Sequence, residues 1–232
     1  MNRYKVFIYF SFAILLWGFK SPENKNSSVF IESSKVSIYD DLKGAKKPDL
    51  HLFEKALLGY IDLKLSGYIE EDNQILSLVD FRLPSSEKRF WVIDLESRTI
   101  LFHTYVAHGE NSGDKYALNF SNRINSHQSS LGYYVTRETY YGKNGLSLRL
   151  EGLEHGFNHH ARKRFIVLHG ADYATEEYLQ NNGGLGHSEG CPAVPMGEHH
   201  NIIEVTKGGS CLFIFFPDLK YTENSRFFVN SM

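Results

Sequence analysis

Cysteine is scarce in this chain: two stand among 232 residues, Cys191 and Cys211. Secreted domains that depend on disulfides carry several pairs, so a disulfide-rich scaffold is excluded. An excess of charge of either sign is also missing, because 25 basic side chains face 27 acidic ones. A protein that binds nucleic acid needs a basic surface for the phosphates, so we expect no nucleic-acid partner.

Long apolar runs are equally rare, and the clearest one is at the N-terminus. Arg3 and Lys5 precede a mostly apolar run over residues 6–19, which is short for a membrane span. A positive start followed by such a run predicts a secretory signal. Residues 17–20 lack a small-x-small cleavage pattern, so an uncleaved anchor with membrane association is the alternative. We therefore expect an exported protein, with residues 1–20 as signal peptide or N-terminal anchor.

The rest of the chain divides into a spacer, one domain and a tail. Residues 21–47 are polar and rich in Ser, Asn and Lys, which predicts a spacer. Pro48 then opens an amphipathic helix, because apolar residues recur at steps of three and four. These residues are Leu52, Phe53, Ala56, Leu57, Tyr60 and Ile61. A single domain is expected over residues 48–217, with a C-terminal tail over 218–232.

Short β-branched and aromatic runs after Gln74 predict strands. They cover residues 75–81, 90–95, 99–108, 133–137, 146–150, 164–169 and 211–216. Long helices do not alternate with them, which excludes a doubly wound parallel sheet. We predict a mainly β domain, a β-sandwich or flattened barrel, with the N-terminal amphipathic helix and a few short helices. One short helix is expected over residues 173–179.

Three kinds of site compete for the segment around Cys191. The first is a serine hydrolase, since Gly186–Gly190 matches G-x-S-x-G with Ser188 at its centre. That fold needs a helix after the serine, which Pro192 and Pro195 would break. It also needs a late histidine, and none follows His200. The match is therefore interpreted as accidental.

The second is a metal site built on histidines. His155 and His159 have the spacing of two ligands on one helix face, with His160 beside them. Gly156 and the absence of helical periodicity argue against such a helix, and no H-E-x-x-H is present. We expect no metal site. His199 and His200 are interpreted as solvated polar residues.

The third is a cysteine acyltransferase. A buried strand over residues 164–168 would place His169 at its end, and Gly190 permits close approach to Cys191. A thiol with a pKa of about 8.5 is mostly protonated at neutral pH, and an imidazole partner lowers that pKa. Backbone N–H groups near Gly190 and Cys191 would form an oxyanion hole. A structural cysteine in a tight turn, or a disulfide with Cys211, remains the alternative.

These residues resemble the signature of a known enzyme family. His169-Gly170 followed by Ser188-x-Gly190-Cys191 resembles the YkuD-type L,D-transpeptidases. The Cys-Pro-Ala-Val sequence at 191–194 resembles the murein L,D-transpeptidase catalytic-domain branch of that group. Further segments over residues 50–217 resemble the same branch: Val106–Gly109, Phe120–Asn122, Ser129–Gly132, Thr139–Gly142, Gly145–Leu148 and Gly152–Glu154.

The resemblance implies a mostly β catalytic domain without cofactor, in the periplasm or cell envelope of a bacterium. Its partners would be peptidoglycan stem peptides. Cys191 is then the nucleophile and His169 its base. The Gly170 region resembles the part whose carbonyl orients that histidine, and the amides of Gly190 and Cys191 would form the oxyanion hole.

Three departures from the family pattern affect the expected site. Glu189 stands where the family commonly has histidine, so it either orients a protonated His169 or faces solvent. Pro192 replaces the usual Arg or Asn, so a substrate carboxylate must be bound elsewhere, with His187 and Arg149 as candidates. Tyr140 and Tyr141 are candidate cleft-wall residues. The long gap before Cys191 predicts a cap over residues 172–185.

The reaction implied by the resemblance is acyl transfer on stem peptides. Cys191 would attack the bond between the third-position diamino acid and the terminal D-alanine. A side-chain amine of a neighbouring stem would then take the acyl group from the thioester, giving a 3→3 cross-link. Water as acceptor would make the protein an L,D-carboxypeptidase. A catalytically inactive wall-binding module is the remaining alternative, and the sequence leaves the oligomeric state open.

Overall fold

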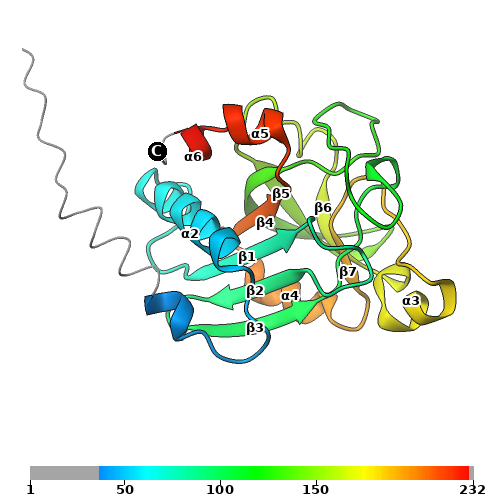
Figure 1. Cartoon of the computed structure of the whole chain (residues 1–232), viewed down its shortest axis with the longest axis horizontal. Coiled ribbons are helices and arrows are strands. Elements are labelled where there is room, and N and C mark those ends of the chain that lie inside the picture. Colours follow the sequence, from blue (N-terminus) through cyan, green and yellow to red (C-terminus); the bar gives the residue numbers. More distant parts are fainter. Residues whose placement is uncertain (1–36, 230–232) are drawn as a thin grey trace, which may run out of the picture.

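A computed structural model describes residues 37–229 (Figure 1). The signal peptide or anchor expected over residues 1–20 and most of the expected spacer lie outside the described residues. Within residues 37–229, no helix has both the length and the apolar character needed to cross a bilayer.

One eight-stranded sheet forms the body of the molecule, in the order β3-β2-β1-β8-β4-β5-β6-β7. The strands are β1 Ile75–Asp80, β2 Phe90–Asp94, β3 Thr99–Thr104, β4 Gly132–Gly142, β5 Gly145–Gly152, β6 Val167–Ala171, β7 Ala193–Pro195 and β8 Cys211–Phe215. Ala107, just beyond β3, forms a bridge with Ala193 of β7, so the two edges of the sheet nearly meet. This confirms the prediction of a mainly β, flattened barrel.

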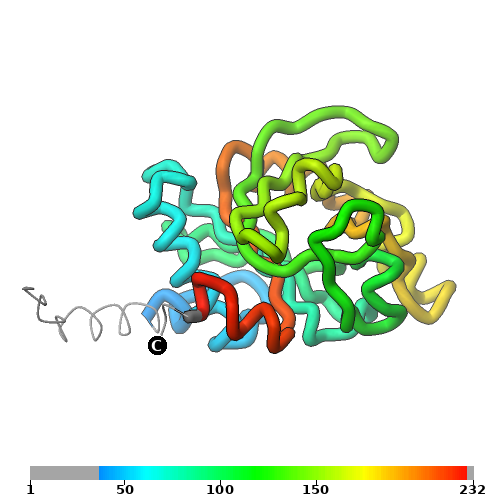
Figure 2. Tube along the Cα trace, turned by 90° about the horizontal axis from the view of Figure 1, so that it is seen from above, coloured from blue at the N-terminus to red at the C-terminus, as the bar shows by residue number. Residues whose placement is uncertain are grey.

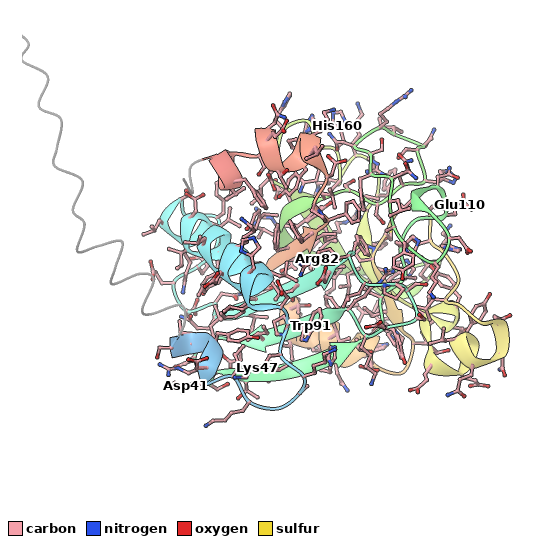
Figure 3. All side chains as sticks on the ribbon, in the orientation of Figure 1. Asp41, Lys47, Arg82, Trp91, Glu110 and His160 are labelled. Atoms are coloured by element: carbon pink, nitrogen blue, oxygen red, sulfur yellow. The ribbon has the colours of Figure 1, made fainter. Side chains whose placement is uncertain are left out.

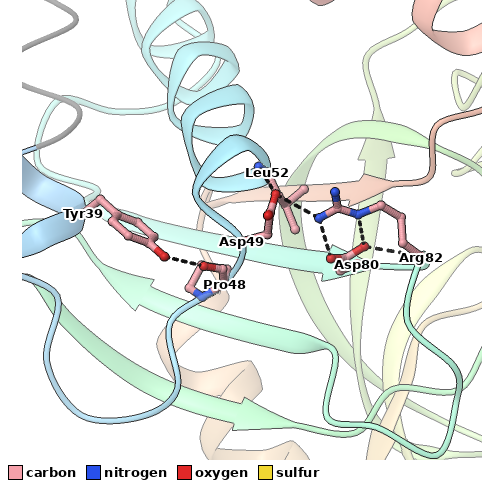
Figure 4. A network of polar contacts seen from close by, with 6 residues as sticks. All are labelled: Tyr39, Pro48, Asp49, Leu52, Asp80 and Arg82. Carbon is pink, nitrogen blue, oxygen red and sulfur yellow. Dashed lines mark hydrogen bonds and ion pairs between the residues drawn. The ribbon is translucent and has the colours of Figure 1, made fainter.

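The predicted amphipathic helix is confirmed as α2, Leu50–Leu65, which packs on β1 and β8. It begins at Leu50 because the Asp49 carboxylate accepts a hydrogen bond from the Leu52 N–H. Figure 4 shows that Asp49 also pairs with Arg82, whose guanidinium is held by Asp80 at the end of β1. The helix start is therefore tied to the sheet.

The remaining helices are short. They are η1 Glu110–Ser112, η2 Asp172–Ala174, α3 Glu176–Asn182, α4 His199–Thr206, α5 Leu219–Asn224 and α6 Arg226–Val229. Strand β7 and helix α4 have no counterpart in the sequence prediction. The buried side chains of α4 include His199, so the expectation that His199 is a solvated residue was wrong.

Both segments that flank the expected domain pack on it within the described chain. Leu42 is buried, and the Trp91 indole N–H donates to the Lys46 carbonyl (2.8 Å), so residues 37–47 lie against the sheet (Figure 3). At the other end, Tyr221 of α5 is buried and its hydroxyl donates to Glu154 (3.0 Å). The described unit thus extends on both sides beyond residues 48–217.

Candidate active site

Strands β5, β6 and β7 carry the candidate residues on one face. Ser147 of β5 pairs with His169 of β6, which in turn pairs with Ala193 of β7. Paired residues project to the same side of a sheet, and side chains alternate along each strand. Leu168 and Val194 accordingly lie in the core. Cys191 lies two residues before Ala193, just ahead of β7, and its side chain packs against the core.

His169 is buried and held in one orientation. Its Nδ1 lies 2.9 Å from the Gly170 carbonyl oxygen, which can only accept, so Nδ1 carries the proton. Burial lowers the pKa of His169, and the positive charges of Lys143 and His199 act in the same direction. The imidazole is therefore neutral at pH 7, with its Nε2 lone pair available as a proton acceptor.

The thiol of Cys191 is half-buried at the start of β6. Its Sγ lies 3.5 Å from the Val167 N–H and 3.6 Å from the Phe165 carbonyl oxygen. Burial raises the pKa of Cys191, while the Val167 N–H and the charge of Arg164 act in the opposite direction. Among residues 37–229 no hydrogen bond joins this thiol to the His169 ring.

The Ser188 side chain stabilises the loop before Cys191 through two hydrogen bonds within that loop. Its hydroxyl accepts from the Gly190 N–H (3.0 Å) and donates to the Cys191 carbonyl (2.6 Å). The Gly190 N–H is thus engaged, so an oxyanion hole would rest on the Cys191 N–H, which meets no acceptor in the described chain. Gly190 has φ of +112°, and a Cβ there would lie 2.7 Å from the Gln128 carbonyl oxygen.

Glu189 faces solvent rather than His169. Its carboxylate lies 3.9 Å from the Nζ of Lys143, and both side chains are exposed. Lys143 comes from the tip of the β4–β5 hairpin, which projects from the body of the molecule (Figure 2). Its charge favours neutral His169 and ionised Cys191.

The four candidate substrate residues fall in three places. Tyr140 pairs with Ser147, and the Arg149 guanidinium lies 4.4 Å from the Tyr140 ring centre, so both share the face of His169. Tyr141 alternates to the other side and lines a pocket of about 480 Å³, together with Lys143 and Gly170. His187 is turned toward Asp114, with its Nε2 3.0 Å from that carbonyl.

Residues 45–215 match the family described as the L,D-transpeptidase catalytic domain. The chain belongs to this family.

Solved structures of L,D-transpeptidases are similar to this chain at low identity. An L,D-transpeptidase from Mycobacterium smegmatis is 10% identical, with a TM-score of 0.39, and 62% of this chain covers 59% of that one. The L,D-transpeptidase LdtMt1, solved with imipenem, is 9% identical, with a TM-score of 0.38 and coverages of 61% and 59%. The chain thus spans about three-fifths of these structures. A comparison with curated proteins found no match.

Two residues near the thiol of this L,D-transpeptidase domain were missed from the sequence. Arg164 was expected in a buried strand, but β6 begins at Val167 and Phe165 is exposed with φ of +57°. The run Arg162–Arg164 is typical of an exposed turn and was the available signal. Tyr173, in the segment predicted as a cap, has its pKa raised to about 12 by burial and by the charges of Cys191 and Glu189.

Arg164 braces the loop beneath Gly190. Its guanidinium donates to the carbonyl oxygens of Ser121 and Gln128, each at 2.6 Å. Its Nη2 would lie 3.2 Å from a Cβ built at Gly190. Arg164 thus holds the loop that contains Ser121 and Gln128 and also lies beside Gly190. Its positive charge favours the thiolate form of Cys191.

A buried cation, Arg89, supports the segment around His108. Arg89 is fully buried and donates to the Val106 carbonyl (2.9 Å) and to Nδ1 of His108 (2.8 Å). Burial and the charge of Arg89 lower the pKa of His108 to about 3. The His108 carbonyl accepts from the Ser188 N–H (3.0 Å), so the Arg89 cation and the neutral His108 ring position the segment that leads to Cys191.

The histidines at 155, 159 and 160 contact one another and Asn122 rather than forming a metal site. The rings of His155 and His159 stack at 4.4 Å, and His159 contacts the Asn122 amide at 2.7 Å. In the part of the chain that the structure covers, no three His, Cys, Asp or Glu residues are arranged to hold a metal ion. Cys191 and Cys211 are both free thiols, and Cys211 is buried in β8.

Proposed function

We propose that this protein is an L,D-transpeptidase that transfers acyl groups between peptidoglycan stem peptides through a thioester on Cys191. The observation that carries the proposal is the state of His169. Its Nδ1 is hydrogen-bonded to the Gly170 carbonyl, and within the described residues its Nε2 has no hydrogen-bond partner. Cys191 lies just before β7, the strand that pairs with the strand of His169. A neutral imidazole in this tautomer is suited to take a proton from a thiol.

Acylation begins with transfer of the Cys191 thiol proton to Nε2 of His169. The thiolate attacks the carbonyl carbon between the L-centre of the third stem residue and the terminal D-alanine. The C–N bond then breaks, and the protonated His169 returns the proton to the leaving amine of D-alanine. The negative charge on the carbonyl oxygen is stabilised by the Cys191 N–H, an effect of about 3 kcal/mol for one donor.

Transfer completes the cycle. A side-chain amine of a neighbouring stem attacks the thioester carbon, the C–S bond breaks, and the amine proton passes through His169 to the departing sulfur. The product is a 3→3 cross-link and a regenerated thiol. With water as the nucleophile, the same steps give an L,D-carboxypeptidase.

Burial of Cys191 disfavours ionisation of its thiol, and two nearby cations favour it. Arg164 and Lys143 both lower the pKa of the thiol. The Sγ contacts Phe165 and Val167 in the resting structure, so we propose that the side chain turns toward His169 when substrate binds. Tyr140 and Arg149, on the same face, are positioned to contact the stem peptide.

The substrate sets the place of action. Peptidoglycan lies outside the cytoplasmic membrane, so we propose that the protein works in the periplasm or cell envelope of a bacterium. Residues 1–20 would export it, and would anchor it if they are retained.

The direct test combines a chemical label with product analysis. We expect imipenem, the ligand in a solved L,D-transpeptidase complex, to acylate the purified protein at neutral pH, as detected by intact-mass spectrometry. Cys191→Ala should abolish the label, and Cys211→Ala, the matched control, should keep it.

Muropeptides incubated with the protein decide between the reactions. A cross-linked dimer supports the transpeptidase, and a trimmed stem alone assigns the site to a carboxypeptidase. If the parent protein takes no label and changes no muropeptide, the enzyme proposal fails and the wall-binding module stands.

A further inference from the structure

A second cavity lies apart from Cys191, between the loop over residues 120–131, the turn at 156–160 and the start of α5. It has a volume of about 620 Å³. His160 at its edge lies beside α5 (Figure 3). None of the steps above uses this cavity.

The cavity has an aromatic floor. Phe120 packs on Phe216 with ring centres 5.2 Å apart, and Phe157 meets Tyr221 edge-on at 5.1 Å. Leu131 completes the apolar lining and is buried. Because these rings are supported from behind, the floor is rigid, and a flat apolar face of a ligand can lie on it.

Polar groups that are available for hydrogen bonds to a ligand surround this floor. Arg123 and Lys220 are exposed, and within the described residues neither cationic head has an ion-pair or hydrogen-bond partner. His160 Nδ1 donates to the Asn122 carbonyl (3.1 Å), which leaves Nε2 as an acceptor. Donors and an acceptor above an apolar floor suit a ring that has C–H faces and oxygen-bearing edges, as a sugar has.

The cavity is linked to the catalytic loop through Arg164. That guanidinium binds the Ser121 carbonyl, in the cavity wall, and the Gln128 carbonyl, which lies under Gly190. A smaller hollow of about 410 Å³ runs along the same loop and shares Ser121 and Arg123 with the cavity. A ligand in the cavity would therefore contact the loop over residues 120–131, whose other end lies under Gly190, next to Cys191.

We propose that this cavity is a glycan subsite, which binds an N-acetylated amino sugar of the strand that carries the stem peptide. The proposal rests on the proposed function, because the stem peptide at Cys191 is attached to that strand. The subsite makes the protein selective for glycan-linked stems over free stem peptides.

The test compares a disaccharide-tetrapeptide with the free tetrapeptide. For the parent protein we expect a KM about tenfold lower on the glycan-linked substrate, which is about 1.4 kcal/mol of binding. The double variant Arg123→Ala/Lys220→Ala should lose this advantage, with kcat unchanged and the free tetrapeptide processed as before. Lys88→Ala, at an exposed lysine just before β2 that does not line the cavity, is the control and should keep the advantage.

Binding of the disaccharide alone, measured by NMR titration of the Cys191→Ala protein, separates the two proposals. Binding that the double variant abolishes supports the subsite even if no muropeptide is turned over, in which case the proposed function fails. Turnover with equal KM for both substrates and no disaccharide binding overturns the subsite and leaves the function standing. Equal binding by the double variant also overturns it.

Discussion

Strands β1 and β8, under α2, are held together by apolar side chains, whereas the loops around β6 and β7 are held by polar ones. Leu76, Leu78 and Phe213 are fully buried in the first region. In the second, Arg89, Arg164 and Ser188 donate hydrogen bonds to the carbonyls of Val106, Gln128 and Cys191. Apolar packing tolerates small shifts of each contact, while hydrogen bonds to a catalytic loop set its geometry.

The comparison indicates that the region under α2 stabilises the fold, whereas the loops around β6 and β7 set the geometry of the candidate site. Loss of an apolar contact under α2 should lower the free energy of unfolding and leave the site intact. Loss of a polar group near Cys191 should change the rate or its pH dependence more than the fold. Three substitutions test this division, in order of decreasing effect.

His169→Ala is expected to have the largest effect, and it should act on the rate alone. Removal of the base leaves the Cys191 thiol without a proton acceptor, so kcat/KM for muropeptides should fall by about 10²–10⁴-fold. Thermal unfolding should move less than for Phe53→Ala, because within residues 37–229 the His169 ring is hydrogen-bonded to its neighbour's carbonyl alone. A variant that keeps parental turnover would remove His169 from the mechanism.

Phe53→Ala should do the opposite. Phe53 is fully buried in α2 and packs against Tyr39 with ring centres 5.5 Å apart. Deletion of such a ring costs about 3–5 kcal/mol of unfolding free energy, measurable by urea denaturation. Activity per folded molecule should equal that of the parent. A large loss of kcat in the folded protein would show that the two regions are coupled.

His108→Gln gives the smallest effect and concerns pH. The pKa of His108 is about 3 when folded and about 6.5 in an unfolded chain. Because the folded pKa is depressed, its stabilising contribution is present above pH 6.5 and is lost as the pH falls toward 3. The parent should therefore lose stability across this window.

The Gln variant should lose less across the same window, since glutamine does not titrate. Thermal melts at several pH values measure the difference. Identical slopes for both proteins would mean that His108 titrates normally in the folded state.

Much of the fold could be predicted from local patterns. Alternating or continuous apolar runs located seven of the eight strands, because burial against a core requires those side chains. Strand β7, Ala193–Pro195, was missed since three residues that contain a proline carry no strand pattern. Helix α4 was missed because its two leading histidines read as solvated residues.

The candidate site divides in the same way. Cys191 and His169 were predicted from the chemistry of their side chains and from the family motif, and they stay a prediction. Arg164, Tyr173 and the pair Arg89–His108 were not predicted, because their roles depend on contacts with residues distant in the sequence, such as Gln128 for Arg164. Arg149 and Tyr140 were guesses that the sheet register brought to the face of His169, and His187 was a guess that it did not.

The amino-acid sequence by itself determined the family, the apolar residues of the core and the two side chains proposed to carry the reaction. Each of these depends on residue type and short spacing. Only the tertiary structure decided the tautomer of His169, the engagement of the Gly190 amide and the cations that surround the thiol. The cations are placed by contacts between segments far apart in the chain, such as Arg164 with Gln128 and Lys143 with Glu189. The contacts of His169 and Gly190 are local, but the fold orients the side chains that make them. Their geometry exists only once the sheet has brought those segments together.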